Sequence, residues 1–137
     1  MGTVYDEITL KNVGDIFRAE DGHIKESEIR ETTIQVVADT GADTLIINET
    51  VRQALGLRIK GNRMAYLANG NGDNCQITEP VEVHWKDRSM TCQPWLMPNA
   101  PEILLGAIPL EDMDIMVDCN RQCLVGVHGD KQIGRAL

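Results

Sequence analysis

The sequence predicts an all-β domain of a closed or barrel-like kind, with one or two short helices. Short segments rich in β-branched and other apolar residues recur along the chain, and clusters of Gly, Asn, Asp and Pro separate them. This pattern is typical of many short strands joined by turns. The 137 residues suffice for one domain with a sizeable core, and they contain no repeat, linker or low-complexity segment. We therefore expect residues 1–137 to form a single domain.

The first half of the chain predicts three strands and a helix. Strands are expected over residues 5–10, 32–38 and 44–47, where apolar or β-branched residues gather. Residues 14–31 are charged and Gly-punctuated, which predicts a long excursion or an extended hairpin between the first two strands. Asn48 is expected to cap a short helix over residues 49–55, which Gly56 ends.

The second half predicts hairpins and one more helix. Residues 63–68 and 75–78 flank a cluster of Asn, Gly and Asp that suits a hairpin turn, and residues 81–85 and 90–97 form a second hairpin. Proline residues then break the pairing before a strand at residues 103–106. Pro109 is placed to open a short helix through residues 110–113, and a last hairpin joins residues 115–117 and 124–127.

Charge and composition exclude several classes of partner. The chain has 13 basic and 21 acidic residues and a net charge of -8, which disfavours nucleic acid and anionic membranes as partners. The start of the chain, with Asp6 and Glu7, is too acidic and polar for a signal peptide. No apolar run approaches the roughly 18 residues that span a bilayer. We therefore expect a cytoplasmic protein.

The cysteines leave a disulfide framework and a metal site open beside plain reduced thiols. Only Cys119 and Cys123 lie close enough in sequence to form a pair of metal ligands, with His128 as a third. A hairpin turn at residues 120–122 would bring these two thiols together for local reasons alone. We expect reduced, partly buried thiols, no metal and no other cofactor.

The most informative segment is the run over residues 36–47, which carries an aspartate from an apolar strand into a turn and then returns to apolar residues. Its centre reads Asp39-Thr40-Gly41-Ala42. Burial of an unpaired carboxylate is costly, so a carboxylate at the end of an apolar strand predicts a use or a set of partners for it. An ordinary Asp-x-Gly surface turn is the alternative.

This run resembles the Asp-Thr-Gly-Ala signature of retropepsin-like (retroviral-type) aspartic proteases, and Asp43 matches a residue that many of those enzymes carry. Residues 104–106, Leu-Leu-Gly, match the family's element of two hydrophobic residues followed by Gly. Residues 65–72 have the place and composition of its flap hairpin. The three elements stand in the family's order, and the resemblance covers about residues 33–127. It is nearest to the small single-domain bacterial members.

The resemblance implies the acid-protease fold, with one half-site per chain and a flap hairpin over residues 64–78. Aspartic proteases need two carboxylates that share a proton, one acting as general base on a water and the other donating a hydrogen bond to the peptide carbonyl. A single Asp-Thr-Gly implies a C2 homodimer in which Asp39 of each subunit meets on the axis. The implied function is that of an aspartic endopeptidase, a hydrolase whose partner is a peptide or protein substrate with bulky apolar residues around the scissile bond.

Residue roles follow from the same resemblance. Thr40 is expected to hydrogen-bond across the dimer axis, Gly41 to let the backbone turn, and Asp43 to bind the substrate main chain. Ile47, Leu104 and Ile108 are candidates for apolar subsite walls, together with Leu67. The implied catalytic residues are Asp39, Thr40 and Gly41; the implied substrate-binding residues are Ala42, Asp43, Leu67, Asn69, Gly70, Asn71 and Gly72; Leu104, Leu105 and Gly106 are expected behind the site.

The chain departs from the family pattern in several places. Ala107 stands where viral relatives have an Arg that helps stabilise the dimer through the aspartate corresponding to Asp43. Ala38 replaces a larger aliphatic residue, residues 14–31 are longer than in retroviral relatives, and the polar tail over residues 126–137 gives no basis for interleaved termini. The dimer is therefore expected to depend on other contacts.

Other functions are less well supported by the sequence. No Ser or Cys has a convincing His partner for nucleophilic hydrolysis. Asp39 and Asp43 are four residues apart, whereas phosphoryl-transferring aspartates on one loop need to be two apart, and no phosphate-binding glycine motif is present. The remaining alternative is a catalytically silent protease-fold dimer that binds peptides or scaffolds an assembly.

Overall fold

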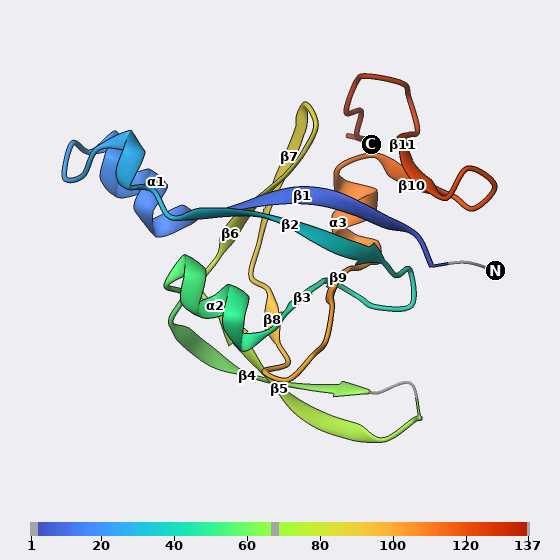
Figure 1. Ribbon diagram of the computed structural model, residues 1–137, viewed down its shortest axis with the longest axis horizontal. Helices are drawn as coiled ribbons and strands as arrows, with labels where there is room; N and C mark the ends of the chain where they lie inside the picture. The colour runs from blue at the N-terminus through green and yellow to red at the C-terminus, as the bar shows by residue number, and fades with distance from the viewer. Residues whose placement is uncertain (1–2, 67–68, 137) are drawn as a thin grey trace.

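The computed structural model describes residues 3–66 and 69–136 and shows a mainly β protein with few short helices, as predicted. One sheet of nine strands, in the order β4-β5-β8-β3-β9-β2-β1-β6-β7, curls around the core (Figure 1). Strands β10 and β11 form a separate two-stranded sheet. None of the helices in the described ranges is long and apolar enough to cross a membrane.

The strands and helices have the following bounds. The strands are Tyr5–Asn12 (β1), Glu31–Ala38 (β2), Leu45–Ile47 (β3), Ile59–Tyr66 (β4), Gly72–Thr78 (β5), Val81–Trp85 (β6), Arg88–Cys92 (β7), Trp95–Leu96 (β8), Ile103–Leu105 (β9), Ile115–Asp118 (β10) and Cys123–Gly126 (β11). The helices are Val13–Glu20 (α1), Glu49–Leu55 (α2) and Ala107–Asp112 (α3), with a short 3-10 turn at Glu26–Glu28 (η1).

Helix α2 confirms the prediction made from its two caps. The Asn48 side chain accepts a hydrogen bond from the Val51 N–H at 3.1 Å, which satisfies one of the free donors at the start of the helix. Gly56 ends the helix in the left-handed conformation, with φ of 64°. Both signals are local, which is why the sequence alone was sufficient to place this helix.

Helix α3 begins earlier than the sequence predicted. It starts at Ala107 with Gly106 as its N-cap, so Pro109 is its third residue rather than its first. The first four N–H groups of a helix have no partner inside the helix, so a proline in the first turn removes no hydrogen bond. The early start connects α3 directly to β9.

The long excursion contains a helix that the sequence analysis did not predict. Helix α1 extends away from the body of the molecule between β1 and β2, which pair as an antiparallel hairpin from Tyr5↔Val37 to Lys11↔Glu31 (Figure 1). Asn12 caps α1 by accepting from the Asp15 N–H, and its own amide donates to the Leu55 carbonyl of α2 at 2.8 Å. The excursion is thereby attached to the core.

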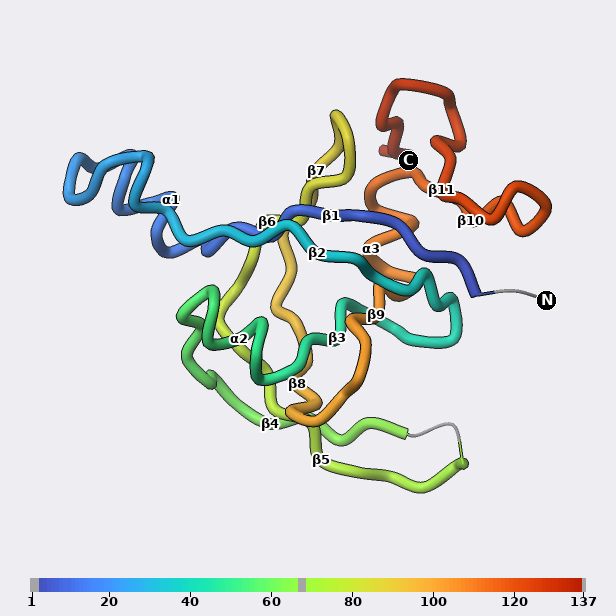
Figure 2. Tube along the Cα trace, viewed as in Figure 1, coloured from blue at the N-terminus to red at the C-terminus, as the bar shows by residue number. Residues whose placement is uncertain are grey.

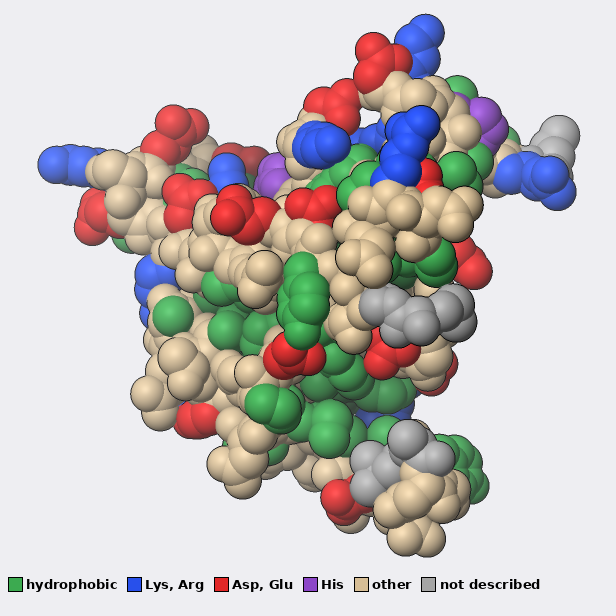
Figure 3. Space-filling view, turned by 45° about the vertical axis from the view of Figure 1, so that its right-hand side comes forward, with side chains coloured by type: hydrophobic (Ala, Val, Ile, Leu, Met, Phe, Trp, Pro, Cys, Tyr) green, Lys and Arg blue, Asp and Glu red, His purple; other side chains and the backbone are tan. Residues whose placement is uncertain are grey.

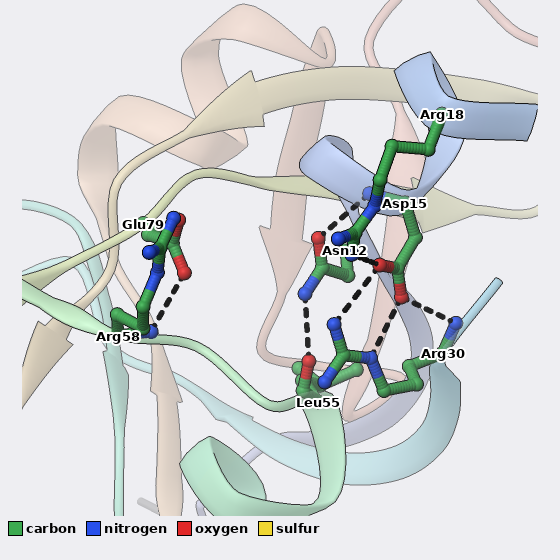
Figure 4. A network of polar contacts seen from close by, with 7 residues as sticks. All are labelled: Asn12, Asp15, Arg18, Arg30, Leu55, Arg58 and Glu79. Carbon is green, nitrogen blue, oxygen red and sulfur yellow. Dashed lines mark hydrogen bonds and ion pairs between the residues drawn. The ribbon is translucent and has the colours of Figure 1, made fainter. Parts of the chain in front are cut away.

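A buried carboxylate holds the two ends of this excursion together (Figure 4). Asp15 is 1% exposed and accepts hydrogen bonds from the Arg30 backbone N–H at 3.0 Å and from the Arg30 guanidinium at 2.8 and 2.9 Å. Arg18 also donates to this carboxylate. Arg58 and Glu79, drawn in the same view, form a second and more exposed ion pair with an N–O distance of 3.0 Å.

A buried arginine fixes the C-terminal segment. Arg88, at the start of β7, is 1% exposed and donates to the carbonyl oxygens of Met113, Asp114 and Gly129. These carbonyls belong to the end of α3 and to the chain beyond β11. Arg88 therefore sets where the β10–β11 hairpin lies relative to the large sheet.

The C-terminal hairpin is confirmed, and it explains why two cysteines lie close together. Asp118 pairs with Cys123 at the end of the ladder, so Cys119 and Cys123 flank one turn. The His128 Nδ1 lies 2.7 Å from an Asp114 carboxylate oxygen. Within residues 3–66 and 69–136, no three His, Cys, Asp or Glu side chains are arranged to hold a metal ion.

Candidate active site

The loop that carries Asp39 is built on three adjacent strands. Strand β9 lies between β2 and β3, with Ala38 paired to Leu105 in parallel and Leu45 paired to Leu105 in antiparallel register. The Asp39 N–H donates to the Leu105 carbonyl at 3.0 Å. The two sequence signatures are therefore in direct contact, and the Leu-Leu-Gly element passes behind the loop.

Backbone hydrogen bonds fix the loop after Asp39. The Ala42 N–H donates to the Asp39 carbonyl at 3.1 Å, and the Gly41 N–H donates to the Asp39 carboxylate at 2.9 Å. The N–H groups of Ala107 and Ile108, at the start of α3, donate to the carbonyls of Ala42 and Asp43 at 2.8 and 2.9 Å. The Asp39 carboxylate is thus oriented by its own loop, and the loop is anchored to a helix.

Gly106 is where this packing is tightest. A Cβ atom at this position would lie 2.4 Å from the Thr44 carbonyl oxygen and 2.6 Å from the Ala42 carbonyl oxygen. Both contacts are with backbone atoms, so a side chain at residue 106 would force the Asp39 loop away from β9.

Replacing Gly106 with Ala is expected to lower the free energy of unfolding by about 1–3 kcal/mol, because the core must move to admit the methyl group. Chemical denaturation measures this change. Gly134→Ala is the matched control, since a Cβ there has no described atom within 4 Å. Equal stability of the two variants would show that the loop tolerates separation from β9.

A cleft of about 670 Å³ opens between the Asp39 loop and the β4–β5 hairpin. In the space-filling view, hydrophobic side chains gather on the face of the body that looks toward this hairpin, and the surface is hollowed between the two (Figure 3). The residues that line the cleft are Asp39, Gly41, Ala42, Asp43, Ile46, Met64, Ala65, Tyr66, Cys75, Trp95, Met97 and Leu104.

The structure brings together only part of the predicted site. Asp39, Gly41, Ala42, Asp43 and Leu104 all line the cleft. The other predicted residues do not line the cleft. Thr40 lines a second hollow, Leu105 is fully buried in the core, and Gly106 lies under the Asp39 loop. The residues exposed at the end of the β4–β5 hairpin are Asn69, Gly70, Asn71 and Gly72. Leu67 lies outside the described residues.

One predicted subsite residue is wrong by a single position. Ile47 is 0% exposed and belongs to the core, whereas its neighbour Ile46 lines the cleft. All three residues of β3 are buried, so the strand lacks the alternation that would have distinguished its two faces. Ile108 is 56% exposed at the start of α3 and does not line the cleft either.

Several cleft residues were missed by sequence reasoning. Met64 and Tyr66 are 59% and 83% exposed on β4, and their spacing by two along a predicted strand was a usable signal. Trp95 and Met97 reach the cleft because β8 pairs with β3 and β5. This long-range pairing leaves no local mark in the sequence.

The cleft combines an apolar lining with acidic groups. The charged residues among those described in its lining are Asp39 and Asp43, both acids, and Asp43 is exposed. Cys75 also contributes to the lining, and burial is the main reason that the pKa of its thiol is raised. This environment suits neutral, extended ligands with apolar side chains better than anionic ligands.

No protein-family model and no curated protein matches this sequence. Solved structures do resemble it. The EIAV protease in complex with the inhibitor HBY-793 aligns with a TM-score of 0.56 and 18% identity, covering 81% of this chain and 88% of the protease chain. The retroviral protease-like domain of Ddi1 from Leishmania major aligns with a TM-score of 0.56 and 15% identity, covering 91% of this chain and 88% of that domain.

The fold is thus that of the retropepsin-like aspartic proteases, as the motifs predicted. At these identities the likeness concerns the fold alone.

Proposed function

We propose that this protein is an aspartic endopeptidase in which two copies of the chain each contribute one Asp39. The observation that carries the proposal is the position of Asp39, which lines both the cleft and a second hollow, of about 750 Å³, that shares no other lining residue with the cleft. A carboxylate at the boundary of two hollows can reach a ligand in one and a partner subunit across the other. A single Asp-Thr-Gly per chain requires that partner for the two-carboxylate mechanism.

The reaction follows from two carboxylates that share a proton. The ionised Asp39 removes a proton from a water molecule, and the water oxygen attacks the peptide carbonyl carbon while the protonated Asp39 of the partner donates to the carbonyl oxygen. As the C–N bond breaks, the Asp39 that took the water proton passes it to the amide nitrogen, and the partner's Asp39 recovers its proton from a hydroxyl of the tetrahedral intermediate, so that the products are a carboxylic acid and an amine and both side chains return to their starting states. The Gly41 N–H donates to Asp39 Oδ1 at 2.9 Å and so orients the carboxylate. Because one carboxyl must be protonated, a mildly acidic pH optimum is expected.

The substrate expected for this cleft is an extended peptide. Among the described strands, β4 is the last of the large sheet, so within that part of the chain one of its edges is unpaired and can add a peptide strand. Met64, Tyr66 and Trp95 offer apolar contact area, and Asp43 can accept hydrogen bonds from peptide N–H groups. We expect bulky apolar residues around the scissile bond and few acidic residues beside them.

The test is cleavage of a diverse peptide library from acidic to neutral pH, with products identified by mass spectrometry. The natural chain is compared with Asp39→Asn and with Asp130→Asn, a control that changes an exposed acid outside the cleft. Cleavage by the natural chain and Asp130→Asn but not by Asp39→Asn supports the proposal. Binding of peptides without cleavage by any of them would instead identify a catalytically silent peptide-binding module.

A further inference from the structure

A further hollow, of about 370 Å³, lies between β5 and the chain that leads from β8 toward β9. These two segments run beside each other (Figure 2). Residues 73–75 line the hollow on one side and residues 96–101 on the other. Cys75 and Met97 line the cleft as well, so the two hollows adjoin at these two side chains. We call this hollow the side pocket.

We propose that the side pocket binds a lysine or arginine side chain of the peptide substrate, and that the Asp73 carboxylate selects it. This inference rests on the proposed function, because it places a peptide substrate in the cleft. Asp39 lines the cleft but not the side pocket, so the selected residue lies away from the scissile bond. Asp73 then determines specificity and takes no part in the chemistry.

Asp73 leaves the same face of β5 as Cys75. Side chains alternate between the two faces of a strand, so residues two positions apart share a face. Cys75 is 4% exposed, which identifies this face as the one turned toward the body of the molecule, while Asp73 is exposed nearer the end of the hairpin. Burial is the main cause that raises the pKa of the Cys75 thiol, and the charge of Asp73 adds to it. The carboxylate therefore acts at the boundary between the side pocket and the cleft.

The charge of Asp73 is not compensated by the described part of the chain. It is the one charged residue among those described in the lining of the side pocket, and none of the ion pairs within residues 3–66 and 69–136 includes it. Its Oδ1 accepts a hydrogen bond from the Asn74 N–H at 2.8 Å. A metal ion would need several such ligands, whereas one carboxylate suits a single ammonium or guanidinium group.

The rest of the lining suits the stem of a basic side chain. Leu96 and Met97 are apolar, and Pro98 and Pro101 add apolar rings. Lysine and arginine pack their methylene groups on surfaces of this kind while the charged head reaches a polar partner. The volume of about 370 Å³ is near the lower end of the range for ligand pockets, roughly 300–1,000 Å³, which suits one long side chain.

The wall over residues 97–101 is fixed to the start of helix α2. The Glu49 N–H donates to the Pro98 carbonyl at 3.2 Å, and the Asn48 side-chain amide donates to the Ala100 carbonyl at 3.1 Å. Proline also fixes its own φ, which stiffens the wall further. The side pocket is therefore formed before a ligand enters, so binding does not have to order this wall.

The test starts from a peptide that the natural chain cleaves and places Lys, Met or Glu in turn at each position beyond the two residues that flank the scissile bond. At one position, kcat/KM is expected to be about fivefold higher with Lys than with Met, and this preference should shrink as salt is added. In Asp73→Asn the preference should be absent at every position. Asn can still accept from the Asn74 N–H, so the turn is kept, and circular dichroism establishes the fold.

Two further variants separate charge recognition from a change of structure. Asp73→Lys should favour the Glu peptide over the Met peptide at the same position, because the charge of the pocket is reversed. Asp130→Asn is the matched control, since it removes an exposed acid that lines neither the side pocket nor the cleft, and it should keep the preference for Lys. A preference for Lys that persisted in Asp73→Asn would overturn the inference.

The outcomes distinguish this inference from the proposed function. Asp39-dependent cleavage with equal kcat/KM for Lys and Met at every position would leave the proposed function intact and overturn the side-pocket inference. If the natural chain cleaves no peptide, the dissociation constants of the Lys and Met forms of peptides that it retains are compared. Tighter binding of the Lys form that Asp73→Asn removes would support the side pocket while the proposed function fails. Peptides that neither bind nor are cleaved would overturn both.

Discussion

Mixing the natural chain with an excess of Asp39→Asn is expected to remove most of its peptidase activity. If the active site needs one Asp39 from each of two copies, a natural chain paired with a variant chain is inactive. With about a ninefold excess of variant and random pairing, the activity per natural chain should fall to about a tenth of its value without variant. The measurement is the rate of cleavage of a selected peptide after the two proteins have exchanged subunits.

A monomeric active site makes a different prediction. In that case the variant is a bystander, and the activity per natural chain stays constant at every mixing ratio. The same mixture assayed before the subunits have exchanged provides the matched control, because competition for substrate lowers the rate at once, whereas mixed pairs form only after exchange. An equal loss of activity before and after exchange would indicate substrate competition rather than subunit exchange.

The sequence was sufficient to predict the parts of the site that depend on adjacent residues. The Asp39 turn and helix α2 are each specified by residues within a few positions of each other, so a short stretch of sequence is enough to predict them. The contact between the Asp39 loop and Leu105 is long-range, and the resemblance to a known family supplied it. Without the resemblance, nothing local would have connected residue 39 with residue 105.

The parts that sequence reasoning missed depend on tertiary contacts. Helix α1 carries mostly charged and small residues, and what holds it is the contact of Asp15 with Arg30, fifteen positions along the chain. The cleft wall formed by Trp95 and Met97 depends on the parallel pairing of β8 with β3. Ile47 was predicted as a cleft residue in place of Ile46 because a strand that is buried on both faces has no alternating pattern of apolar and polar residues.

Replacing Asp15 with Asn is expected to lower the free energy of unfolding by about 3 kcal/mol. The carboxylate is 1% exposed and accepts charge-assisted hydrogen bonds from Arg30, and breaking a buried pair by removing one partner costs several kcal/mol. Part of the loss is recovered because the Arg30 side chain is 44% exposed and can turn toward water. Denaturant unfolding near neutral pH measures the change.

Two controls separate this effect from a general loss of charge. Glu20→Gln changes an exposed acid on the same helix and should leave the stability within about 0.5 kcal/mol of the natural value. Arg18→Ala removes the more exposed of the two arginines, with 54% of its side chain accessible, and should cost about 0.5–1 kcal/mol. If Glu20→Gln lowered the free energy of unfolding as much as Asp15→Asn does, the loss would be due to the removal of a negative charge from helix α1 and not to the contact with Arg30.

The pH dependence of stability gives an independent test of the same contact. The Arg30 guanidinium is the main cause that lowers the pKa of the Asp15 carboxyl from 3.8, against the effect of burial, which raises it. Since the folded pKa lies below the unfolded value, the contribution of Asp15 is fully present above the unfolded pKa. As the pH falls through 3.8, the unfolded chain takes up a proton that the native protein does not, and the contribution is lost.

Asp15→Asn should therefore show a shallower fall in stability below neutral pH than the natural chain, while Glu20→Gln should follow the natural curve. If the free energy of unfolding fell equally with pH in the natural chain and in Asp15→Asn, the result would contradict a native Asp15 carboxylate paired with Arg30. Because Asp15 lines neither the cleft nor the second hollow beside Asp39, Asp15→Asn should keep the natural rate of peptide cleavage wherever it is folded. A change in that rate without unfolding would mean that the excursion acts on the site, rather than only holding the fold together.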